Sequence, residues 1–346
     1  MDMSVVKARL QQHFSDGLVM IVGSGLSCAE GLPGMAELAD YLCENVGSDI
    51  TSEDVPEWEA ILPLIKSEGL EAAFLKKPPT ANIEKLIATL TADLIGRKER
   101  DTISDVFEGG RQLRLTRLIA HILKPKSGIP VVTTNYDRLI EVAVEEAGIG
   151  ADTMFVGKFA GVLNETESRL SFCRKVTLKR RNVVYSYSPR ALIYKPHGSL
   201  DWYLRGGRPV SHSGRLPNAS RLIITPGKNK FRNGYDSPFD VHRSRANEAI
   251  DRAKRFLILG YGFNDDHLET HLTPAIQEGR PTLIITYKLS SIAEALAKSN
   301  ANVIAIDRFE KNGDCGTRLI FEKEEIFLLG VCIWDVHSFV TEVLEP

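Results

Sequence analysis

Two polar side chains with complementary chemistry follow apolar segments of the chain. Asn135 comes directly after the segment IPVVTT at 129–134, and His197 follows the apolar segment at 191–195. An amide carries both a hydrogen-bond donor and an acceptor, so Asn135 could orient a water molecule without repelling a developing positive charge. An imidazole titrates near neutral pH, so His197 could accept a proton from that water or from a sugar hydroxyl. Taken singly, Asn135 is equally typical of a turn and His197 of a structural histidine.

Two glycine-rich turns also follow apolar runs. Gly23-Ser24-Gly25 comes after the run at 19–22, and Gly260-Tyr261-Gly262-Phe263 comes after the run at 256–259. Ser27 and Glu30 have the spacing of a capping box, which predicts a helix that starts there with free N–H groups. A strand, a glycine turn and a helix N-terminus together favour a diphosphate site. The full G-x-G-x-x-G pattern is absent because residue 28 is Cys.

Alternating apolar strands and amphipathic helices predict how these loops are positioned. Strands are expected at 19–22, 129–134, 191–195, 256–259, 282–286 and 302–306. This pattern predicts an α/β fold with a doubly wound, mostly parallel Rossmann-like sheet in a single domain spanning 1–346. All four polar loops then fall at the carboxyl ends of parallel strands, which is the edge where such sheets bind ligands.

Three segments lie outside this alternation. Residues 50–125 are helical throughout and predict a helical insertion, and residues 307–346 predict a C-terminal β segment followed by a helix. We expect residues 157–236 to form an irregular, basic insertion, with the run RKVTLKRR at 174–181 and a polar segment at 205–236 that could cover the site. Such a basic run is usually a solvated face, but it could contact nucleic acid or an acidic partner.

Composition excludes several classes of protein. The 346 residues carry a formal net charge of -2, and no apolar run is long enough to predict a transmembrane helix or a signal-peptide core. The five cysteines are scattered without a C-x-x-C pair, so neither zinc nor another metal nor a disulfide framework is expected. A reducing cytoplasm is the simplest compartment.

Four motifs in this order resemble the sirtuin fold, and specifically the sirtuin-like NAD-cleaving proteins of bacterial anti-phage defence. These are GSGLSCAEGLP at 23–33, TTNYD at 133–137, KPHGSLDW at 195–202 and GYGFNDDH at 260–267. The resemblance implies that NAD+ is the substrate and that Asn135 and His197 are the catalytic residues. It implies contacts with NAD+ by Gly23, Ser24, Gly25, Ser27, Pro33, Thr134, Asp137, Gly260, Tyr261, Gly262, Phe263 and Tyr287.

Departures from the deacylase members favour plain hydrolysis of NAD+ over deacylation. The paired cysteines that hold zinc in deacylases are absent, and Gly34-Met35-Ala36 replaces the segment that carries their Phe-Arg pair. The resemblance further implies a homo-oligomer that depletes NAD+ as a defence effector, with a HerA-type hexameric ATPase as a partner.

Other functions remain open at this point. The basic run could make the chain a nucleic-acid-binding or nuclease subunit of a defence complex, with NAD+ or ADP-ribose as a regulator. A non-catalytic NAD+ sensor and a protein deacylase are further alternatives. Hydrolysis and cyclisation share the same bond cleavage, so the sequence does not separate them. In GYGFNDDH, Asp265 is expected to be a helix N-cap and not a catalyst.

Overall fold

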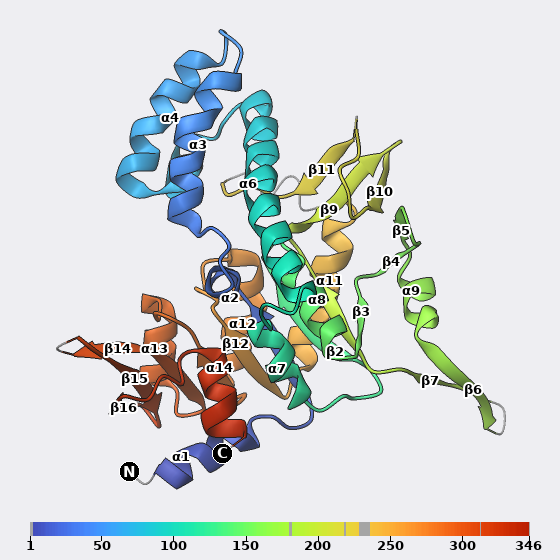
Figure 1. Ribbon diagram of the computed structural model, residues 1–346, viewed down its shortest axis with the longest axis vertical. Coiled ribbons are helices and arrows are strands. Elements are labelled where there is room, and N and C mark those ends of the chain that lie inside the picture. The colour runs from blue at the N-terminus through green and yellow to red at the C-terminus, as the bar shows by residue number, and fades with distance from the viewer. Residues whose placement is uncertain (1–2, 180–181, 218, 228–235, 312, 346) are drawn as a thin grey trace.

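The computed structural model describes residues 3–179, 182–217, 219–227, 236–311 and 313–345 (Figure 1). Residues 180–181 of the basic run and 228–235 of the polar segment therefore lie outside the described residues. Among the helices that are described, none combines the length and the hydropathy needed to span a bilayer.

A large sheet forms the centre of the protein. Within the described residues it has nine strands in the order β16-β15-β14-β13-β12-β1-β2-β8-β3, and the strands from β14 to β3 are parallel. Its strands are β1 (Leu18–Val22), β2 (Ile129–Thr133), β3 (Gly150–Asp152), β8 (Arg190–Tyr194), β12 (Arg255–Leu259), β13 (Thr282–Ile285), β14 (Val303–Lys311), β15 (Asp314–Phe321) and β16 (Glu324–Leu329). The predicted doubly wound, mostly parallel sheet is confirmed, and all six strands predicted for it are present.

Helices cover both faces of this sheet, as side-chain alternation along the strands requires. In β1, Met20 and Val22 point into one core, whereas Val19 and Ile21 point into the other. The first core is closed by α1 (Met3–Gln12), α7 (Arg114–Ala120), α8 (Leu139–Glu146), α14 (Val336–Phe339) and η1 (Val340–Leu344). The second is closed by α11 (Phe239–Arg252), α12 (Asp266–Gln277) and α13 (Ser291–Ser299).

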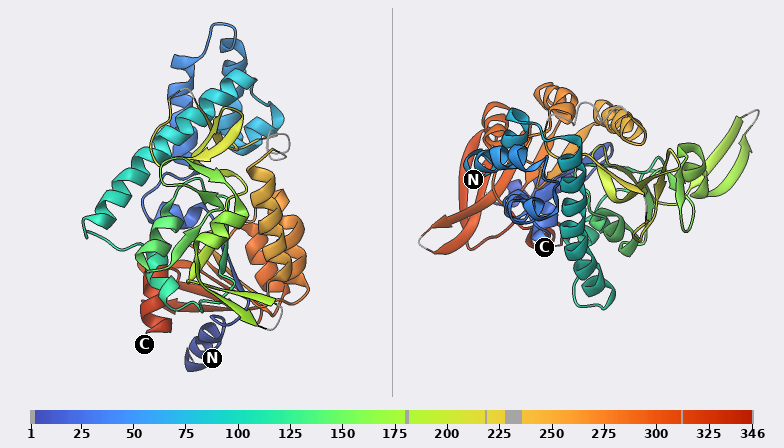
Figure 2. Two further views of the ribbon diagram at one scale, coloured as in Figure 1. Left: turned by 90° about the vertical axis from the view of Figure 1, so that its right-hand side faces the viewer. Right: turned by 90° about the horizontal axis from the view of Figure 1, so that it is seen from above.

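A separate group of helices stands beyond the strand ends, at the top of Figure 1. It comprises α3 (Met35–Asp49), α4 (Val55–Glu68), α5 (Leu70–Lys76) and the long α6 (Ala81–Phe107). These helices share their own apolar core around Trp58 and Phe74. Because α3 belongs to this core and α7 packs on the main sheet, the helical unit occupies residues 35–107. Figure 2 shows α6 running from this unit down to the sheet.

Residues 157–236, expected to be irregular, are instead rich in β structure. A second sheet has the order β11-β9-β10-β5-β4 among the described residues, and β6 pairs with β7 in a separate hairpin. The expectation was wrong because these strands are antiparallel and mix buried with exposed residues, so they lack the continuous apolar run by which a buried parallel strand is predicted. The elements are β4 (Phe155–Val156), β5 (Gly161–Leu163), α9 (Glu165–Ser171), β6 (Cys173–Lys179), β7 (Asn182–Tyr187), β9 (Gly198–Arg205), β10 (Arg208–Ser211) and β11 (Ser220–Ile223).

Candidate active site

The site lies where the winding of the sheet reverses. β1 is central, with β2 on one side and β12 on the other. The loops that follow β1 and β12 meet there, and the short helix α2 (Ser24–Ala29) begins directly after β1. This is the crevice in which open α/β sheets bind ligands.

Close packing explains the glycines of these two loops. A Cβ atom on Gly23 would lie 2.5 Å from the carbonyl oxygen of Gly260, and Gly260 itself has a φ of +57°. The amide of Gly25 donates to Gly260 O at 2.9 Å, and that of Leu26 donates to Gly23 O at 3.2 Å. The prediction of free N–H groups is therefore wrong at Gly25, whose amide binds the loop after β12, and at Leu26, whose amide binds back within its own turn.

The predicted capping box at Ser27 is also wrong. α2 starts at Ser24 with Gly23 as its N-cap, so Ser27 lies inside the helix. Its hydroxyl donates to Asp137 Oδ2 at 2.7 Å instead. The carboxylate of Glu30, the other half of the expected box, accepts from the backbone N–H of Arg114 at 2.7 Å.

A buried polar chain orients Asn135. Its side-chain nitrogen Nδ2 donates to Gly23 O at 3.0 Å and to Ser27 Oγ at 2.9 Å. Both amide protons are thus used within the protein. The carbonyl oxygen Oδ1 is then the group of Asn135 that could accept a hydrogen bond from a molecule in the adjoining cavity. All three side chains in the chain from Asn135 through Ser27 to Asp137 are buried.

Asp137 supports the loop. Its Oδ1 accepts from the backbone N–H of Leu139 at 3.2 Å, which anchors the start of α8. Burial raises the pKa of Asp137, whereas the charge of Lys195 and the hydrogen bond from Ser27 lower it. Lys195 is fully buried, and its ammonium group donates to Asp137 O and, at 2.9 Å, to Glu141 Oε1. Sequence reasoning missed Lys195 as the cation that holds this loop.

His197 faces a carboxylate. Its Nε2 lies 2.7 Å from Asp265 Oδ2, and both residues are buried. Asp265 is also the N-cap of α12, as predicted, because its Oδ1 accepts from Leu268 N at 3.0 Å. An ionised carboxylate at that distance can accept a hydrogen bond from an Nε2–H group and so orient the ring. The place of Asp265 in the motif GYGFNDDH was the sequence signal for its contact with His197, but only its role as a cap was predicted.

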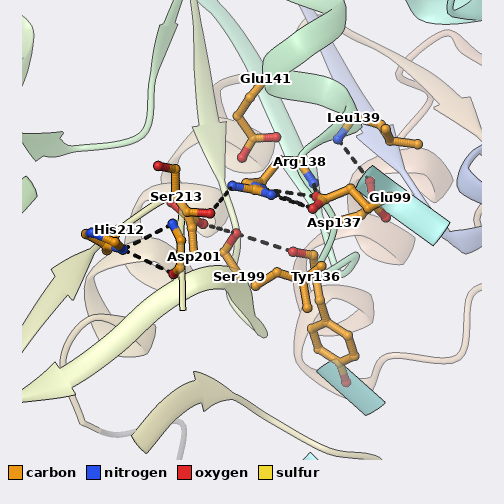
Figure 3. A network of polar contacts seen from close by, with 12 residues as sticks. Glu99, Tyr136, Asp137, Arg138, Leu139, Glu141, Ser199, Asp201, His212 and Ser213 are labelled. Carbon is orange, nitrogen blue, oxygen red and sulfur yellow. Dashed lines mark hydrogen bonds and ion pairs between the residues drawn. The ribbon is translucent and has the colours of Figure 1, made fainter. Parts of the chain in front are cut away.

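Figure 3 shows how the loop after β2 is tied to its surroundings. Arg138 donates to Glu99 of α6 through Nη2 at 2.6 Å and through its backbone N–H at 2.6 Å, and Glu99 is buried. On the other side, Ser199 Oγ donates to Tyr136 O at 3.3 Å. The loop that carries Asn135 is therefore held between α6 and β9.

Two cavities adjoin these loops and share Ser24, Tyr261 and Gly262 in their walls. The first has a volume of about 220 Å³, and the helical unit contributes Leu38, Glu71 and Ile95 to it. The predicted site residues that line it are Ser24, Ser27, Pro33, Thr134, Asn135, Asp137, His197, Tyr261 and Gly262.

The second cavity has a volume of about 590 Å³ and lies beside the carboxyl ends of β12 and β13. The predicted residues that line it are Ser24, Gly25, Gly260, Tyr261, Gly262 and Tyr287. Trp334, which the sequence analysis missed, also lines it and contacts Tyr287 edge to face, with ring centroids 5.3 Å apart.

Two predicted contacts do not line either cavity. Gly23 is buried under Tyr261, and its carbonyl oxygen serves Asn135. Phe263 is 1% exposed and packs in the sheet core against Tyr261, with ring centroids 5.3 Å apart. Its apolar side chain belongs to the fold, although its position in the motif suggested a ligand contact.

Comparison with known families identifies the chain. Residues 130–305, slightly more than half of the 346-residue chain, match the family model of the SIR2-like domain. The protein belongs to the SIR2-like family. The matched range contains the last three of the four motifs, at 133–137, 195–202 and 260–267. The predicted sirtuin-like α/β fold is thereby confirmed.

Several solved structures are similar to this SIR2-like chain. A crystal structure of a Sir2 homologue in complex with NAD is 15% identical, with 82% of this chain and 84% of that chain covered and a TM-score of 0.41. A mutant Sir2 homologue in complex with ADP-ribose is 12% identical, with coverages of 84% and 87% and a TM-score of 0.42. No curated protein sequence matches the chain at a significant level.

Within the described residues, no group of three or more His, Cys, Asp and Glu side chains is placed to hold a metal ion. The five cysteines are free thiols, and Cys28 and Cys43 lie on different helices, α2 and α3.

Proposed function

We propose that this SIR2-like protein is an NAD+ glycohydrolase that converts NAD+ and water into nicotinamide, ADP-ribose and a proton. The observation that supports this best is that Asn135 and His197, far apart in the sequence, line one cavity with oriented polar atoms. That cavity meets a second one at Ser24, Tyr261 and Gly262. Two adjacent cavities with a shared wall suit a molecule with two ends linked by a diphosphate.

In this proposal the nicotinamide ribose occupies the cavity that contains Asn135 and His197. The bond between nicotinamide and C1′ of the ribose breaks, the electron pair leaves with the neutral nicotinamide, and positive charge develops on the ribose. Oδ1 of Asn135 accepts a hydrogen bond from the attacking water. His197 accepts a proton from that water or from a ribose hydroxyl, and Asp265 stabilises the resulting imidazolium. A positioned base of this kind typically contributes about 10²–10⁴-fold in rate.

The adenosine end is assigned to the second cavity. Tyr287 and Trp334 provide aromatic surface there, while the exposed Ser24 hydroxyl lies where the two cavities join. We place the diphosphate at this junction. Since the amides of Gly25 and Leu26 are already paired within the protein, we assign its contacts to Ser24 and to the loop at Tyr261 and Gly262.

Water is proposed as the acceptor, and an acyl-lysine substrate is not. The support is the pair of sequence departures described above, namely the missing zinc cysteines and the replacement of the Phe-Arg segment by Gly34-Met35-Ala36. The cellular role that fits this activity is NAD+ depletion by a cytoplasmic effector of anti-phage defence, working as a homo-oligomer with a HerA-type ATPase.

The basic run favours a second candidate function, contact with DNA. Its described residues lie in β6, which pairs with β7 in a hairpin that projects from the body of the protein in Figure 1. Arg174 and Lys175 are exposed there, and so are the apolar Val176 and Leu178. Basic and apolar side chains together suit either a phosphate backbone or a protein partner. DNA binding that weakens steeply with salt would indicate the phosphate backbone.

The test is NAD+ consumption with product identification by mass spectrometry. Wild type, Asn135→Ala and His197→Ala are compared, each alone and with any HerA-type ATPase that a neighbouring gene encodes. The proposal is supported if wild type releases nicotinamide and ADP-ribose and neither variant does. Cleavage of an acyl-lysine peptide, or full NAD+ cleavage by Asn135→Ala, contradicts it.

A further inference from the structure

Two thiols lie close together outside the candidate active site. Cys315 is in β15, Cys332 follows β16, and their sulfur atoms are 3.4 Å apart. Both residues are half-buried, so a small oxidant can reach them. A disulfide bond needs a sulfur separation of about 2 Å, so the two side chains need a small rotation to bond.

The surroundings give the two sulfurs different roles. Burial raises the pKa of the Cys315 thiol, but hydrogen bonds with Cys332, Arg308 and Trp334 outweigh it, and the net shift is downward. Burial, together with Cys315 itself, raises the pKa of Cys332. Because the thiolate is the reactive form, Cys315 is the attacking sulfur and Cys332 the one that resolves the intermediate.

We propose that Cys315 and Cys332 are a reversible oxidation site that forms an intramolecular disulfide on reaction with a peroxide. The Cys315 thiolate attacks one peroxide oxygen, the O–O bond breaks, and Cys315 becomes a sulfenic acid while hydroxide leaves and takes up a proton. The Cys332 sulfur then attacks the sulfenic sulfur, the S–S bond forms, and water leaves. In total, two thiols lose two electrons and two protons, and the peroxide is reduced to water.

The site is connected to the larger cavity. Arg308, which contacts Cys315, also donates from Nη1 to the Tyr287 hydroxyl at 3.1 Å. Trp334 lies two residues after Cys332, and both Trp334 and Tyr287 line that cavity. Forming the disulfide removes the Cys315 thiol that Arg308 contacts and ties the segment before Trp334 to β15, so both supports of the Tyr287 and Trp334 wall change. The effect on the substrate rests on the proposed binding of NAD+ there. We expect oxidation to change the KM for NAD+ by about fivefold or more, the lower end of typical coupling between two sites.

The experiment treats the full-length protein with hydrogen peroxide and maps its thiols by mass spectrometry without reduction. The expected result is a loss of about 2 Da, a cross-link between the peptides that hold Cys315 and Cys332, and full reversal by dithiothreitol. Cys315→Ser and Cys332→Ser abolish the cross-link. Cys43→Ser, a half-buried cysteine in the helical unit, retains it and serves as the matched control.

Two outcomes overturn the proposal. One is oxidation of wild type straight to sulfinic acid at Cys315 without a cross-link, and the other is a bond between two chains through the exposed Cys28. Neither depends on activity, because mass mapping reports the disulfide whether or not the protein cleaves NAD+. A cross-link that leaves the KM unchanged would keep the oxidation site and remove its connection to the cavity.

Discussion

Removal of one hydroxyl group tests the polar chain that orients Asn135. In Ser27→Ala, Asp137 Oδ2 loses its 2.7 Å hydrogen bond and one amide proton of Asn135 loses its 2.9 Å acceptor. Ser27 and Asp137 are 8% and 3% exposed, so water does not readily replace the missing group. A hydrogen bond to a charged group contributes about 1.5–3 kcal/mol and a neutral one about 1 kcal/mol. We therefore expect the free energy of unfolding to fall by about 2–4 kcal/mol.

The pH dependence of this loss has a defined sign. The hydroxyl of Ser27 donates to ionised Asp137 and so lowers the pKa of that carboxyl in the folded state, although burial raises it overall. Without the hydroxyl, the folded-state pKa rises further. The destabilisation by Ser27→Ala is therefore largest at high pH, and it shrinks as the pH falls and Asp137 becomes protonated in the folded protein.

Denaturant unfolding of wild type and Ser27→Ala at several pH values measures both effects. Ser67→Ala is the matched control, since Ser67 is an exposed serine that also lies within a helix and whose hydroxyl donates to Pro63 O. The control is expected to stay within about 0.5 kcal/mol of wild type. A loss of unfolding free energy in Ser27→Ala as small as that of the control, or a loss that grows as the pH falls, would refute the hydrogen-bonded chain.

Three further substitutions test other parts of the structure. Lys195→Met leaves Glu141 without its buried cation and should lower the free energy of unfolding by about 3–5 kcal/mol. The double variant Lys195→Met with Glu141→Leu should recover a part of that loss, and equal losses in the single and double variants would contradict the pairing. Asp265→Asn keeps the cap acceptor but removes the charge beside His197, so NAD+ cleavage should fall by about 10²-fold or more in a protein that still folds, as kinetics and denaturation on one preparation would show. Burial lowers the pKa of His13 to about 4, so the unfolded chain binds a proton there that the folded one does not, and stability is lost as the pH falls from about 6.5 to 4. His13→Gln should reduce that slope by up to about 1.4 kcal/mol per pH unit, and an unchanged slope would exclude a neutral buried His13.

Buried parallel strands could be predicted because their sequences are continuous apolar runs. Each of the six predicted strands is present, and the four polar loops meet at one edge. The pairing of Asn135 with His197 in one cavity followed from that topology. Local patterns were less reliable. Ser27 and Glu30 have capping-box spacing, but Asp137 and Arg114 are their partners, and those residues are distant in the sequence.

Other features depended on contacts that no local pattern encodes. The role of Lys195 requires Glu141 to face it from a neighbouring element, and the second role of Asp265 requires the approach of a loop from β8. Phe263 shows the opposite error, because it lies inside a motif that adjoins the site while its own side chain packs in the core. A motif therefore locates a loop, whereas tertiary packing decides which of its side chains reach the cavity.

The helical unit is part of the site, and the connection runs through Glu99. This carboxylate in α6 is 1% exposed and accepts hydrogen bonds from both the guanidinium and the backbone N–H of Arg138, which is three residues beyond Asn135. A buried charge pair is costly to break on one side only, so α6 and the Asn135 loop hold a fixed relation. The same helical unit supplies Leu38, Glu71 and Ile95 to the cavity wall. The sheet edge thus positions the polar atoms, and the helical unit closes one side of the cavity that they line.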